Sequence, residues 1–309
     1  MASRIYRLNF KGEVHFGNGT LDQSEPAFMA DTLFSALSIE ALHCERFDDL
    51  LDAAASGRLL FTNAMPFRGD RYYLPKPILK IQAQSQDADP SERKKFKKLS
   101  YIASDLLEDY LNGRFGFSKN GNSSFGKADS RIKASVRNGT DETLPYHVGS
   151  FRFDKGCGLY VLARCADASA AGLLDSLFSS LSYSGIGGKR SSGFGRFDLA
   201  IEDASELEKA LSGLCQGYSS RRLSMLLSSA LPKDDELEAA MDGASYLICK
   251  RSGFAAPDGG ELLKKRDLFV FAAGSCFKNK FKGGIYDVSK GQGHPVYRYA
   301  MPFFCEVHS

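Results

Sequence analysis

The chain has 309 residues, of which 43% are hydrophobic and 25% are charged, and its formal net charge is +3. These values are typical of a folded protein with room for two ordinary domains. They exclude a chain that is basic over its whole surface, but they allow basic side chains to gather on one face.

The sequence carries no signal for a membrane or a metal site. The first residues, MASRIYRLNFKGEVHF, are charged and lack the apolar core of a secretion signal. The most apolar window, LFVFAAGSCF, is too short to span a bilayer. The seven cysteines include no C-x-x-C pair, which favours reduced thiols over a zinc module. We therefore expect a cytoplasmic protein with no membrane contact, metal or cofactor.

The first predicted elements alternate between strand and helix. Residues 4–16 alternate apolar and polar side chains as a strand does, and a loop over 17–30 follows. Asp31 is then predicted to N-cap a helix over 32–42, which is apolar nearly all round and therefore buried. Further along, the patterns predict a helix over 47–55, a strand over 58–65 and an extended stretch with two prolines over 67–79.

The pattern in the middle of the chain indicates an insertion into the first domain. Apolar residues over 91–111 have helical spacing, and residues 113–130 are rich in Gly, Ser and Asn. Two extended arms over 131–153 flank NGTDET, which indicates a hairpin with a loop longer than the minimal turn. The first 200 residues end with a strand over 158–165, a helix over 169–183 and a glycine-rich loop that leads into a strand over 194–201.

Without the insertion, this order is β-α-β, hairpin, β-α-β, which is close to the ferredoxin-like arrangement of a four-stranded sheet with two helices on one face. Beyond a helical connector at 203–214, we predict a helix over 234–242 and strands near 221–229, 244–251, 266–273 and 295–300. We therefore predict an α+β fold of two ferredoxin-like (RRM-type) domains. The first is residues 1–202 with an insertion at about 84–155, and the second, a degenerate copy, is residues 203–309.

The loop between residues 185 and 195, GIGGKRSSGFG, is the strongest candidate site. Glycines permit positive φ and expose backbone N–H groups, which together form a concavity for anions. The candidate residues are Gly185, Gly187, Gly188, Lys189, Arg190, Ser191, Ser192, Gly193 and Gly195. The spacing fits neither a Walker loop nor a dinucleotide fingerprint. These residues favour a sugar-phosphate backbone as ligand, but a ligand-free loop whose glycines serve close packing explains them equally well.

Longer segments carry a family resemblance. The loop contains two Gly-hydrophobic-Gly triplets separated by five residues. This pattern resembles the glycine-rich loop of the RAMP proteins of CRISPR systems, which have ferredoxin-like folds. Three further segments occur in matching order: YRLNFKGEVHFGNGTLDQSEPAFMADTLFSALSIEAL, YYLPKPIL at 72–79 and GHPVYRYAMPF near the end. Together they resemble the Csm subunit (subunit four) that holds the repeat-derived 5′ tag of the guide RNA, the crRNA, in type III-A effector complexes.

This resemblance implies an RNA-binding subunit with no catalytic residue. Its partners would be the crRNA 5′ tag, the large polymerase/cyclase subunit, the first backbone RAMP subunit and, indirectly, target RNA. The glycine-rich loop would contact the RNA backbone, with His15, Phe16 and Gly17 beside it at the end of the first strand. The hairpin would be the projecting thumb of the family. Four basic residues of the thumb are assigned to RNA from location and charge alone, namely Arg131, Lys133, Arg137 and Arg152.

The main alternative is an endoribonuclease. Some members of the superfamily process the guide precursor without metal, with a histidine near the end of the first strand, and His15 occupies such a place as a possible general base. The repeated backbone subunit cuts target RNA with an aspartate before the first helix, a region that Asp22 and Asp31 flank here. The ADTLFSAL and GHPVYRYA segments match the tag-holding subunit, so we predict binding without cleavage. A protein–protein adaptor without RNA contact is the third alternative.

Other basic and aromatic residues receive simpler interpretations. The runs at 92–98, 264–267 and 278–282 are interpreted as solvated charged faces, although Phe277 and Phe281 could stack on bases. His294, Tyr297 and Arg298 belong to the C-terminal segment of the family and are assigned to structure rather than to RNA.

Overall fold

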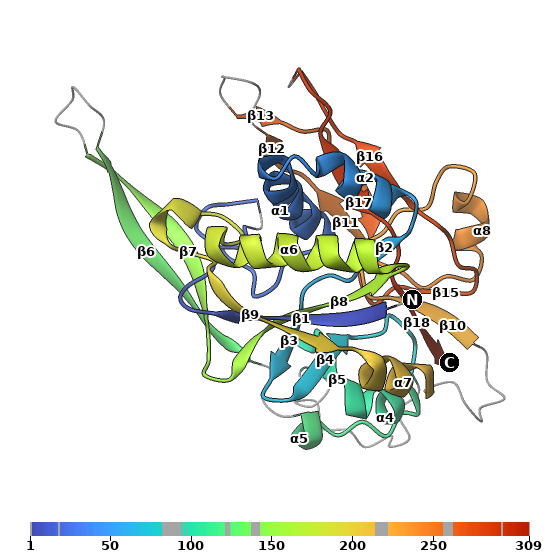
Figure 1. Cartoon of the computed structure of the whole chain (residues 1–309). Coiled ribbons are helices and arrows are strands. Elements are labelled where there is room, and N and C mark those ends of the chain that lie inside the picture. The colour runs from blue at the N-terminus through green and yellow to red at the C-terminus, as the bar shows by residue number, and fades with distance from the viewer. Residues whose placement is uncertain are drawn as a thin grey trace.

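The computed structural model describes residues 2–17, 19–81, 94, 96, 98–120, 124–136, 143–213, 222–255, 262–291 and 293–308. At its centre lies a seven-stranded sheet in the order β5-β4-β3-β8-β1-β9, with β2 also paired to β8 (Figure 1). All its pairings are antiparallel. The strands are β1 (Ala2–Phe10), β2 (Leu59–Phe61), β3 (Met65–Arg68), β4 (Arg71–Pro75), β5 (Tyr101–Ala103), β8 (Cys157–Cys165) and β9 (Phe197–Asp203).

Strand β1 lies inside the sheet, next to the edge strand β9, and has buried residues on both of its faces. It pairs with β8 on one side and β9 on the other, so that Leu8 lies opposite both Leu159 and Leu199. Because side chains alternate along a strand, Tyr6 and Leu8 enter the core on one face while Ile5 enters a second core on the other. The first strand ends at Phe10, earlier than the predicted end at residue 16. Beyond it, Val14 and Phe16 form only isolated bridges.

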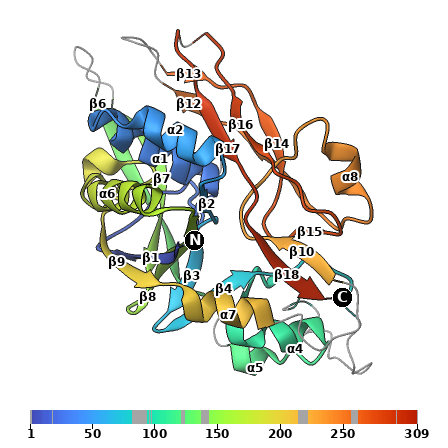
Figure 2. The ribbon, with the colours of Figure 1, turned by 45° about the vertical axis from the view of Figure 1, so that its right-hand side comes forward.

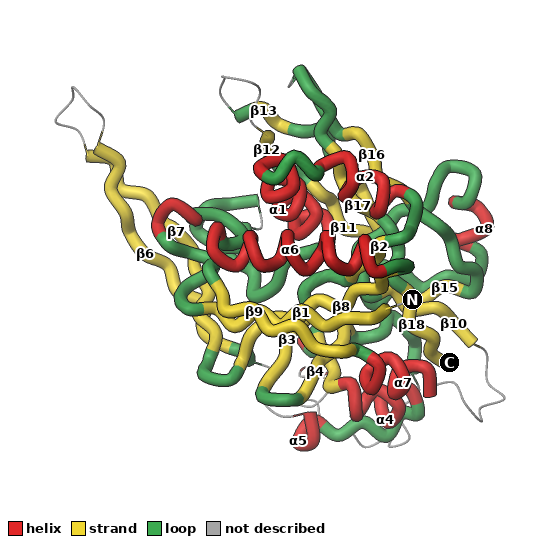
Figure 3. Tube along the Cα trace, viewed as in Figure 1, coloured by secondary structure: helices red, strands yellow, loops and turns green. Residues whose placement is uncertain are grey.

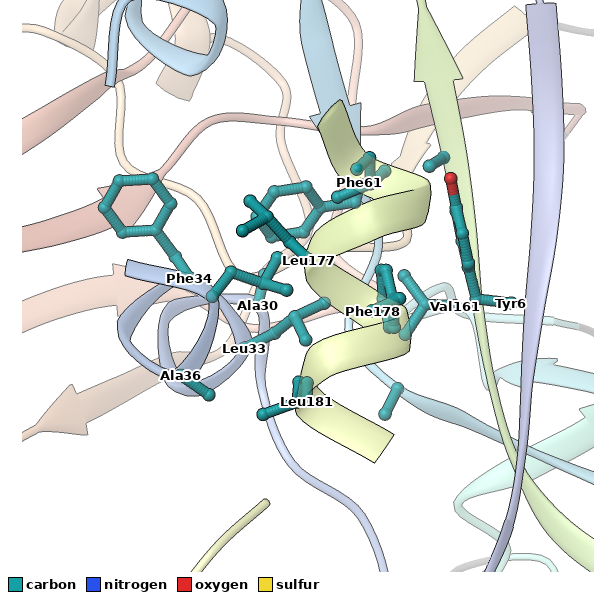
Figure 4. Packing of buried hydrophobic residues seen from close by; sticks show 14 of the residues in the cluster. Tyr6, Ala30, Leu33, Phe34, Ala36, Phe61, Val161, Leu177, Phe178 and Leu181 are labelled. Atoms are coloured by element: carbon teal, nitrogen blue, oxygen red, sulfur yellow. The ribbon is translucent and has the colours of Figure 1, made fainter. Parts of the chain in front are cut away.

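Three helices cover one face of the sheet, above it in Figure 1: α1 (Ala30–His43), α2 (Phe47–Ala55) and α6 (Ala168–Ser184). Figure 4 shows Phe178 of α6 close to Tyr6 of β1, and their rings stack with centroids 4.1 Å apart. Buried Glu40 of α1 accepts hydrogen bonds from Ser180 and Ser184 of α6, which joins the two helices. This layer fixes the end of α6, where the glycine-rich loop begins.

The other face is covered by α4 (Leu107–Leu111), α5 (Phe117–Asn120) and α7 (Ser205–Gly213) together with C-terminal strands. The second core contains Ile5 and Tyr160 as well as Met225 and Val307, so residues on both sides of position 202 share it. The predicted helix over 91–111 is interrupted: described residues 94, 96 and 98 are helical, but Tyr101–Ala103 pairs with β4 as strand β5, and α4 begins at Leu107. Among the described residues, no helix is long and apolar enough to cross a membrane.

The predicted hairpin is present and projects from the sheet (Figures 1 and 3). Strands β6 (Gly126–Val136) and β7 (Thr143–Phe153) pair in antiparallel register from Gly126 opposite Phe153 to Val136 opposite Thr143. The first arm begins five residues before the predicted start at 131. Residues 137–142, which include Arg137, lie outside the described residues.

The C-terminal part consists of small antiparallel sheets, coloured orange to red in Figure 2. The predicted strands occur at 222–226, 248–251, 268–271 and 297–300, and α8 falls within the predicted helix over 234–242, whereas five further strands were not predicted. Together with the central sheet they confirm a mixed α/β fold. The elements are β10 (Arg222–Leu226), α8 (Leu237–Met241), β11 (Ile248–Arg251), β12 (Phe254–Ala255), β13 (Leu263–Lys264), β14 (Leu268–Phe271), β15 (Cys276–Phe277), β16 (Gly284–Asp287), β17 (Tyr297–Ala300) and β18 (Phe304–His308).

Asp31 does not cap helix α1, contrary to the prediction. The N-cap is Met29, and the backbone N–H of Ala30 is satisfied from another segment by Asn63 Oδ1 at 2.9 Å. Asp31 is instead buried in the first turn, where its carboxylate accepts hydrogen bonds from Arg251 of β11 and Arg298 of β17. This ion cluster attaches the C-terminal strands to α1.

Phe277 and Phe281 are not available to stack on bases, because both rings are buried 5.3 Å apart in an apolar cluster. Their neighbours Lys278 and Lys280 form ion pairs with Asp242 and Glu306, both at 3.0 Å. In the run at 92–98, only residues 94, 96 and 98 are described.

Candidate nucleic-acid interface

The glycine-rich loop closes tightly between α6 and β9. Gly185, Gly187, Gly193 and Gly195 have φ values of 80°, 96°, 82° and 77°, and Lys189 also has a left-handed backbone with φ 60°. Left-handed backbone is uncommon for a residue with a side chain. The two ends of the loop meet where the Ile186 N–H donates to the Gly195 carbonyl at 3.1 Å. The segment from Lys189 to Gly193 therefore protrudes as a short turn.

The loop packs directly on residues 13–16, which follow β1. The Gly188 N–H donates to the His15 carbonyl at 2.8 Å, and the Gly195 N–H donates to the Glu13 carbonyl at 3.0 Å. A Cβ atom on Gly187 would lie 2.6 Å from the His15 carbonyl oxygen, and one on Gly195 would lie 2.0 Å from that of Ile186. At these two positions glycine is required for close approach of backbone to backbone.

The hairpin packs on the same four residues. Val14 and Phe151 exchange two backbone hydrogen bonds of 2.9 Å, and His15 Nδ1 lies 2.7 Å from the Gly149 carbonyl. His15 and Phe16 therefore lie against the glycine-rich loop, as predicted, and residues 13–16 join this loop to the hairpin. Gly17 is exposed beside them.

Two lysines interlock the hairpin and the loop. Lys189 of the loop has its Nζ 5.2 Å from the ring centroid of Tyr146 on β7, and Lys133 of β6 has its Nζ 5.5 Å from that of Phe194 in the loop. Within the described part of the chain, neither these lysines nor Arg190 has a carboxylate oxygen within 4.0 Å. Ser191, Ser192 and Gly193 at the turn are exposed. The result is a basic surface whose charge is not neutralised by described carboxylates.

Two hairpin arginines are held differently, by Glu13. The carboxylate of Glu13 is 7% exposed and accepts a hydrogen bond from Arg131, and an Arg152 nitrogen lies 3.9 Å from the same oxygen. Both arginine side chains remain more than half exposed. Glu13 was not predicted as a site residue, and its sequence signal is a carboxylate within the predicted first strand.

A pocket of about 650 Å³ lies beside the loop, between residues 25–29, α1 and the glycine-rich turn. His15, Phe16 and Gly17 line it from the end of the first strand, and Arg190 lines it from the loop. Arg251 of β11 also lines it, and no sequence motif marked that residue. Among the described residues, no group of three metal-ligating side chains is present.

The remaining candidate residues have structural contacts. Tyr297 stacks on Phe47 with centroids 6.2 Å apart, and Arg298 is 4% exposed in the Asp31 cluster. These contacts confirm the predicted structural role of Tyr297 and Arg298. Because Asp31 is bound by two arginines, its carboxylate is not free to act on RNA as the nuclease alternative would require.

Comparison with known proteins identifies the family. A family model described as the CRISPR Csm4 C-terminal domain matches residues 219–307. A Mycobacterium tuberculosis protein named "CRISPR system Cms protein Csm4" is 39% identical over 98% of this chain and 97% of its own length. A Streptococcus thermophilus protein of the same name is 40% identical over 99% of each chain.

Solved structures show the same fold at lower identity. A chain in the crystal structure of a Csm3–Csm4 subcomplex of the type III-A interference complex superposes with a TM-score of 0.64, at 15% identity and 99% coverage of both chains. A chain in a Csm1–Csm4 cassette bound to pppApA gives a TM-score of 0.63, at 20% identity, covering 100% of this chain and 98% of its own. The full-length similarity to the curated relatives carries the conclusion: this chain belongs to the Csm4 family of CRISPR proteins.

Proposed function

We propose that this chain is the RNA-binding, non-catalytic subunit of a type III-A CRISPR complex in the cytoplasm. It holds the repeat-derived 5′ tag of the crRNA and links the large polymerase/cyclase subunit to the first backbone subunit, meeting target RNA only indirectly. The assembly part of the proposal is supported by structures of relatives, in which Csm4 is complexed with Csm3 or with Csm1.

One observation carries the RNA-binding part. Lys133 and Lys189 lie where the hairpin meets the glycine-rich loop, held over aromatic rings rather than against carboxylates, and Arg190 follows Lys189 in the loop. Fixed cations beside an open turn of small residues suit a phosphodiester backbone, since phosphate contacts supply most of the affinity for nucleic acid. The exposed Ser191 and Ser192 hydroxyls add hydrogen-bond donors at the same turn.

We also propose that the N-terminal part is ferredoxin-like. Its support is the antiparallel strand order β3-β8-β1-β9, with β2 beside β8 and with α1 and α6 on one face. This is the order expected when β-α-β, hairpin and β-α-β are folded in succession. The degenerate second copy over 203–309 and the boundary at 202 remain part of the proposal.

Binding to repeat RNA tests the function directly. End-labelled RNA that carries the 5′ tag would be titrated with the full chain, alone and with the large subunit, at several salt concentrations. Lys189→Ala/Arg190→Ala should weaken binding and reduce the slope of log affinity against log salt by about 1.4, because each single-strand phosphate contact contributes about 0.7. The matched control is Lys209→Ala/Lys233→Ala, which removes the same charge from other exposed positions. Equal slopes for both variants would overturn the assignment of the loop.

The endoribonuclease alternative has one observation in its favour. The Gly149 carbonyl accepts from His15 Nδ1–H, so in a neutral imidazole the proton-accepting nitrogen would be Nε2, which lies near Gly17 and Gly188. Denaturing gels of the same RNA, run without divalent metal, distinguish the two functions. Intact RNA supports the binding subunit. A cut within the repeat that is lost in His15→Ala would replace the proposal with the nuclease.

A further inference from the structure

A partly buried cluster of two arginines and one carboxylate lies next to the pocket. Arg251 donates two hydrogen bonds to the Asp31 carboxylate, at 2.9 and 3.0 Å, and Arg298 donates a third. Burial and the nearby Arg298 lower the pKa of Lys265, which is consistent with a locally positive environment. The neighbouring Asp267 is already paired with Lys250 at 2.8 Å.

One carboxylate therefore serves two guanidinium groups. The Nε of Arg298 is buried and has no hydrogen-bond partner among the described residues, and the Arg298 side chain is 5% exposed. Buried charge is costly unless it is paired, so such a cluster is stabilised by a further anion. Arg251 is the member of the cluster that lines the pocket, so the pocket is where an anion can reach it.

The pocket has the size and lining of a small-ligand site. Its volume of about 650 Å³ lies within the range of roughly 300 to 1,000 Å³ that such sites have. Apolar and aromatic side chains form much of the wall, and Arg190 and Arg251 enter from segments far apart in the sequence. The wall includes Phe16, Phe28, Ile39, Tyr101 and Ile186, and Ser35 of α1 lines the pocket with them.

We propose that this pocket takes one nucleotide unit of the bound RNA, with its phosphate paired to Arg190 and Arg251 and its base against the apolar wall. The inference rests on the proposed function and deepens it, because it names the unit of RNA that is held. Single-stranded RNA is commonly recognised through bases turned out of the stack onto aromatic side chains. The pocket opens beside the glycine-rich loop, so a strand bound there can deliver a base without leaving the loop.

A pocket-filling variant tests the base. Ser35 of α1 lines the pocket and is partly exposed, so Ser35→Trp should occupy the space of the base. The matched control is Leu42→Trp, which adds an indole to the same helix at a position that is 59% exposed and outside the pocket. We expect Ser35→Trp to weaken RNA binding by about tenfold, as loss of one stacked base does, and Leu42→Trp to leave it unchanged. Ile39→Trp is a second pocket variant for use if Ser35→Trp does not fold.

A spectroscopic measurement locates the nucleotide. RNAs with 2-aminopurine at one tag position each would be bound to the wild-type chain and to the pocket-filling variant. One position should change its fluorescence on binding wild type and lose that change in Ser35→Trp. Responses that are equal in the two proteins at every position would overturn the proposal.

A second pair of variants tests the phosphate. Arg251→Gln should reduce the salt slope of RNA binding by about 0.7, as the loss of one phosphate contact does. Lys250→Gln, its neighbour on β11, lies outside the pocket and should leave the slope unchanged. Identical slopes for the two variants would contradict the role of Arg251.

These experiments distinguish failure of the proposed function, failure of the pocket assignment and binding of a free nucleotide. If the wild-type chain does not bind RNA, the proposed function fails. If it binds RNA and Ser35→Trp binds equally well, only the pocket assignment fails. Binding of AMP alone is measured as well. If AMP binds saturably, and Ser35→Trp abolishes this binding but leaves RNA affinity unchanged, the pocket holds a free nucleotide. That result would overturn the proposal that it holds a nucleotide of the bound RNA.

Discussion

Lys189 extends from the glycine-rich loop over the ring of Tyr146 on the hairpin, with its Nζ 5.2 Å from the ring centroid. The reciprocal contact of Lys133 with Phe194 ties the same two elements from the opposite direction. Each lysine is thereby positioned by an aromatic ring, which attracts the cation without neutralising its charge. The surface is preorganised for an anion rather than closed by internal ion pairs.

Removing the ring should weaken RNA binding without changing its salt dependence. A cation–π contact at an exposed site contributes about 0.5–1 kcal/mol, so Tyr146→Ala should reduce RNA affinity about two- to fivefold. The salt slope should stay the same because no charge is lost. Fluorescence anisotropy at several salt concentrations measures both quantities, with Tyr183→Ala, an exposed residue of α6, as the control. An unchanged affinity would show that Lys189 needs no positioning by Tyr146.

Neutralising Glu13 should strengthen RNA binding. Glu13 holds Arg131 and lies 3.9 Å from an Arg152 nitrogen, so its carboxylate competes with phosphate for both side chains. Glu13→Gln keeps a hydrogen-bond acceptor for Arg131 and removes the charge. We expect higher affinity and a slope steeper by about 0.7 for each arginine that then contacts a phosphate.

The same titration with Glu238→Gln, an exposed carboxylate of α8, controls for net charge. A loss of affinity in Glu13→Gln comparable to that of Arg131→Ala would contradict this prediction. The carboxylate would then organise the arginines for RNA rather than withhold them.

The Asp31 cluster should be important for stability. Asp31 is 4% exposed and is the carboxylate that both Arg251 and Arg298 contact. Asp31→Asn would leave the two guanidinium groups without a counter-charge, and breaking a buried pair in this way costs about 3–5 kcal/mol. Urea unfolding measures the change in the free energy of unfolding, with exposed Asp22→Asn as the control. A free energy equal to that of the control would contradict the role assigned to this cluster.

The N-cap of helix α6, the helix that leads into the glycine-rich loop, should make the free energy of unfolding sensitive to acid. The Ala170 N–H and then Arg58 lower the pKa of Asp167, the N-cap of α6, below its ordinary value. A carboxyl whose pKa is lower in the folded state stabilises the fold above its unfolded pKa of about 3.9, and this contribution is lost as pH falls through the folded pKa. Asp167→Asn keeps the capping acceptor and does not titrate. The stability difference between wild type and this variant should therefore shrink as pH falls from about 5 to about 2. A difference independent of pH would contradict the prediction.

Local features of the site could be predicted from sequence, and distant contacts could not. The loop 185–195 was identified because its glycines, charges and flanking elements are contiguous. Glu13 and Arg131 are 118 positions apart, and Asp31 and Arg251 are 220 apart, so their pairing depends on the folded topology. No single-sequence pattern encodes such a contact.

The interruption of the predicted helix over 91–111 has a comparable cause. Leu99, Ile102 and Leu106 have helical spacing and are all buried, but Tyr101–Ala103 completes the edge of the sheet beside β4. Backbone pairing across the sheet therefore overrides the local periodicity. The hairpin was predicted more accurately because its two arms are adjacent in sequence and pair with each other along their whole length.

The binding of RNA to the glycine-rich loop would be visible in a structure of the chain with RNA that carries the 5′ tag, determined together with the large subunit and the first backbone subunit. We expect backbone phosphates to contact Lys189 and Arg190 where the glycine-rich loop meets the hairpin. RNA that follows another face and leaves this loop uncovered would contradict it.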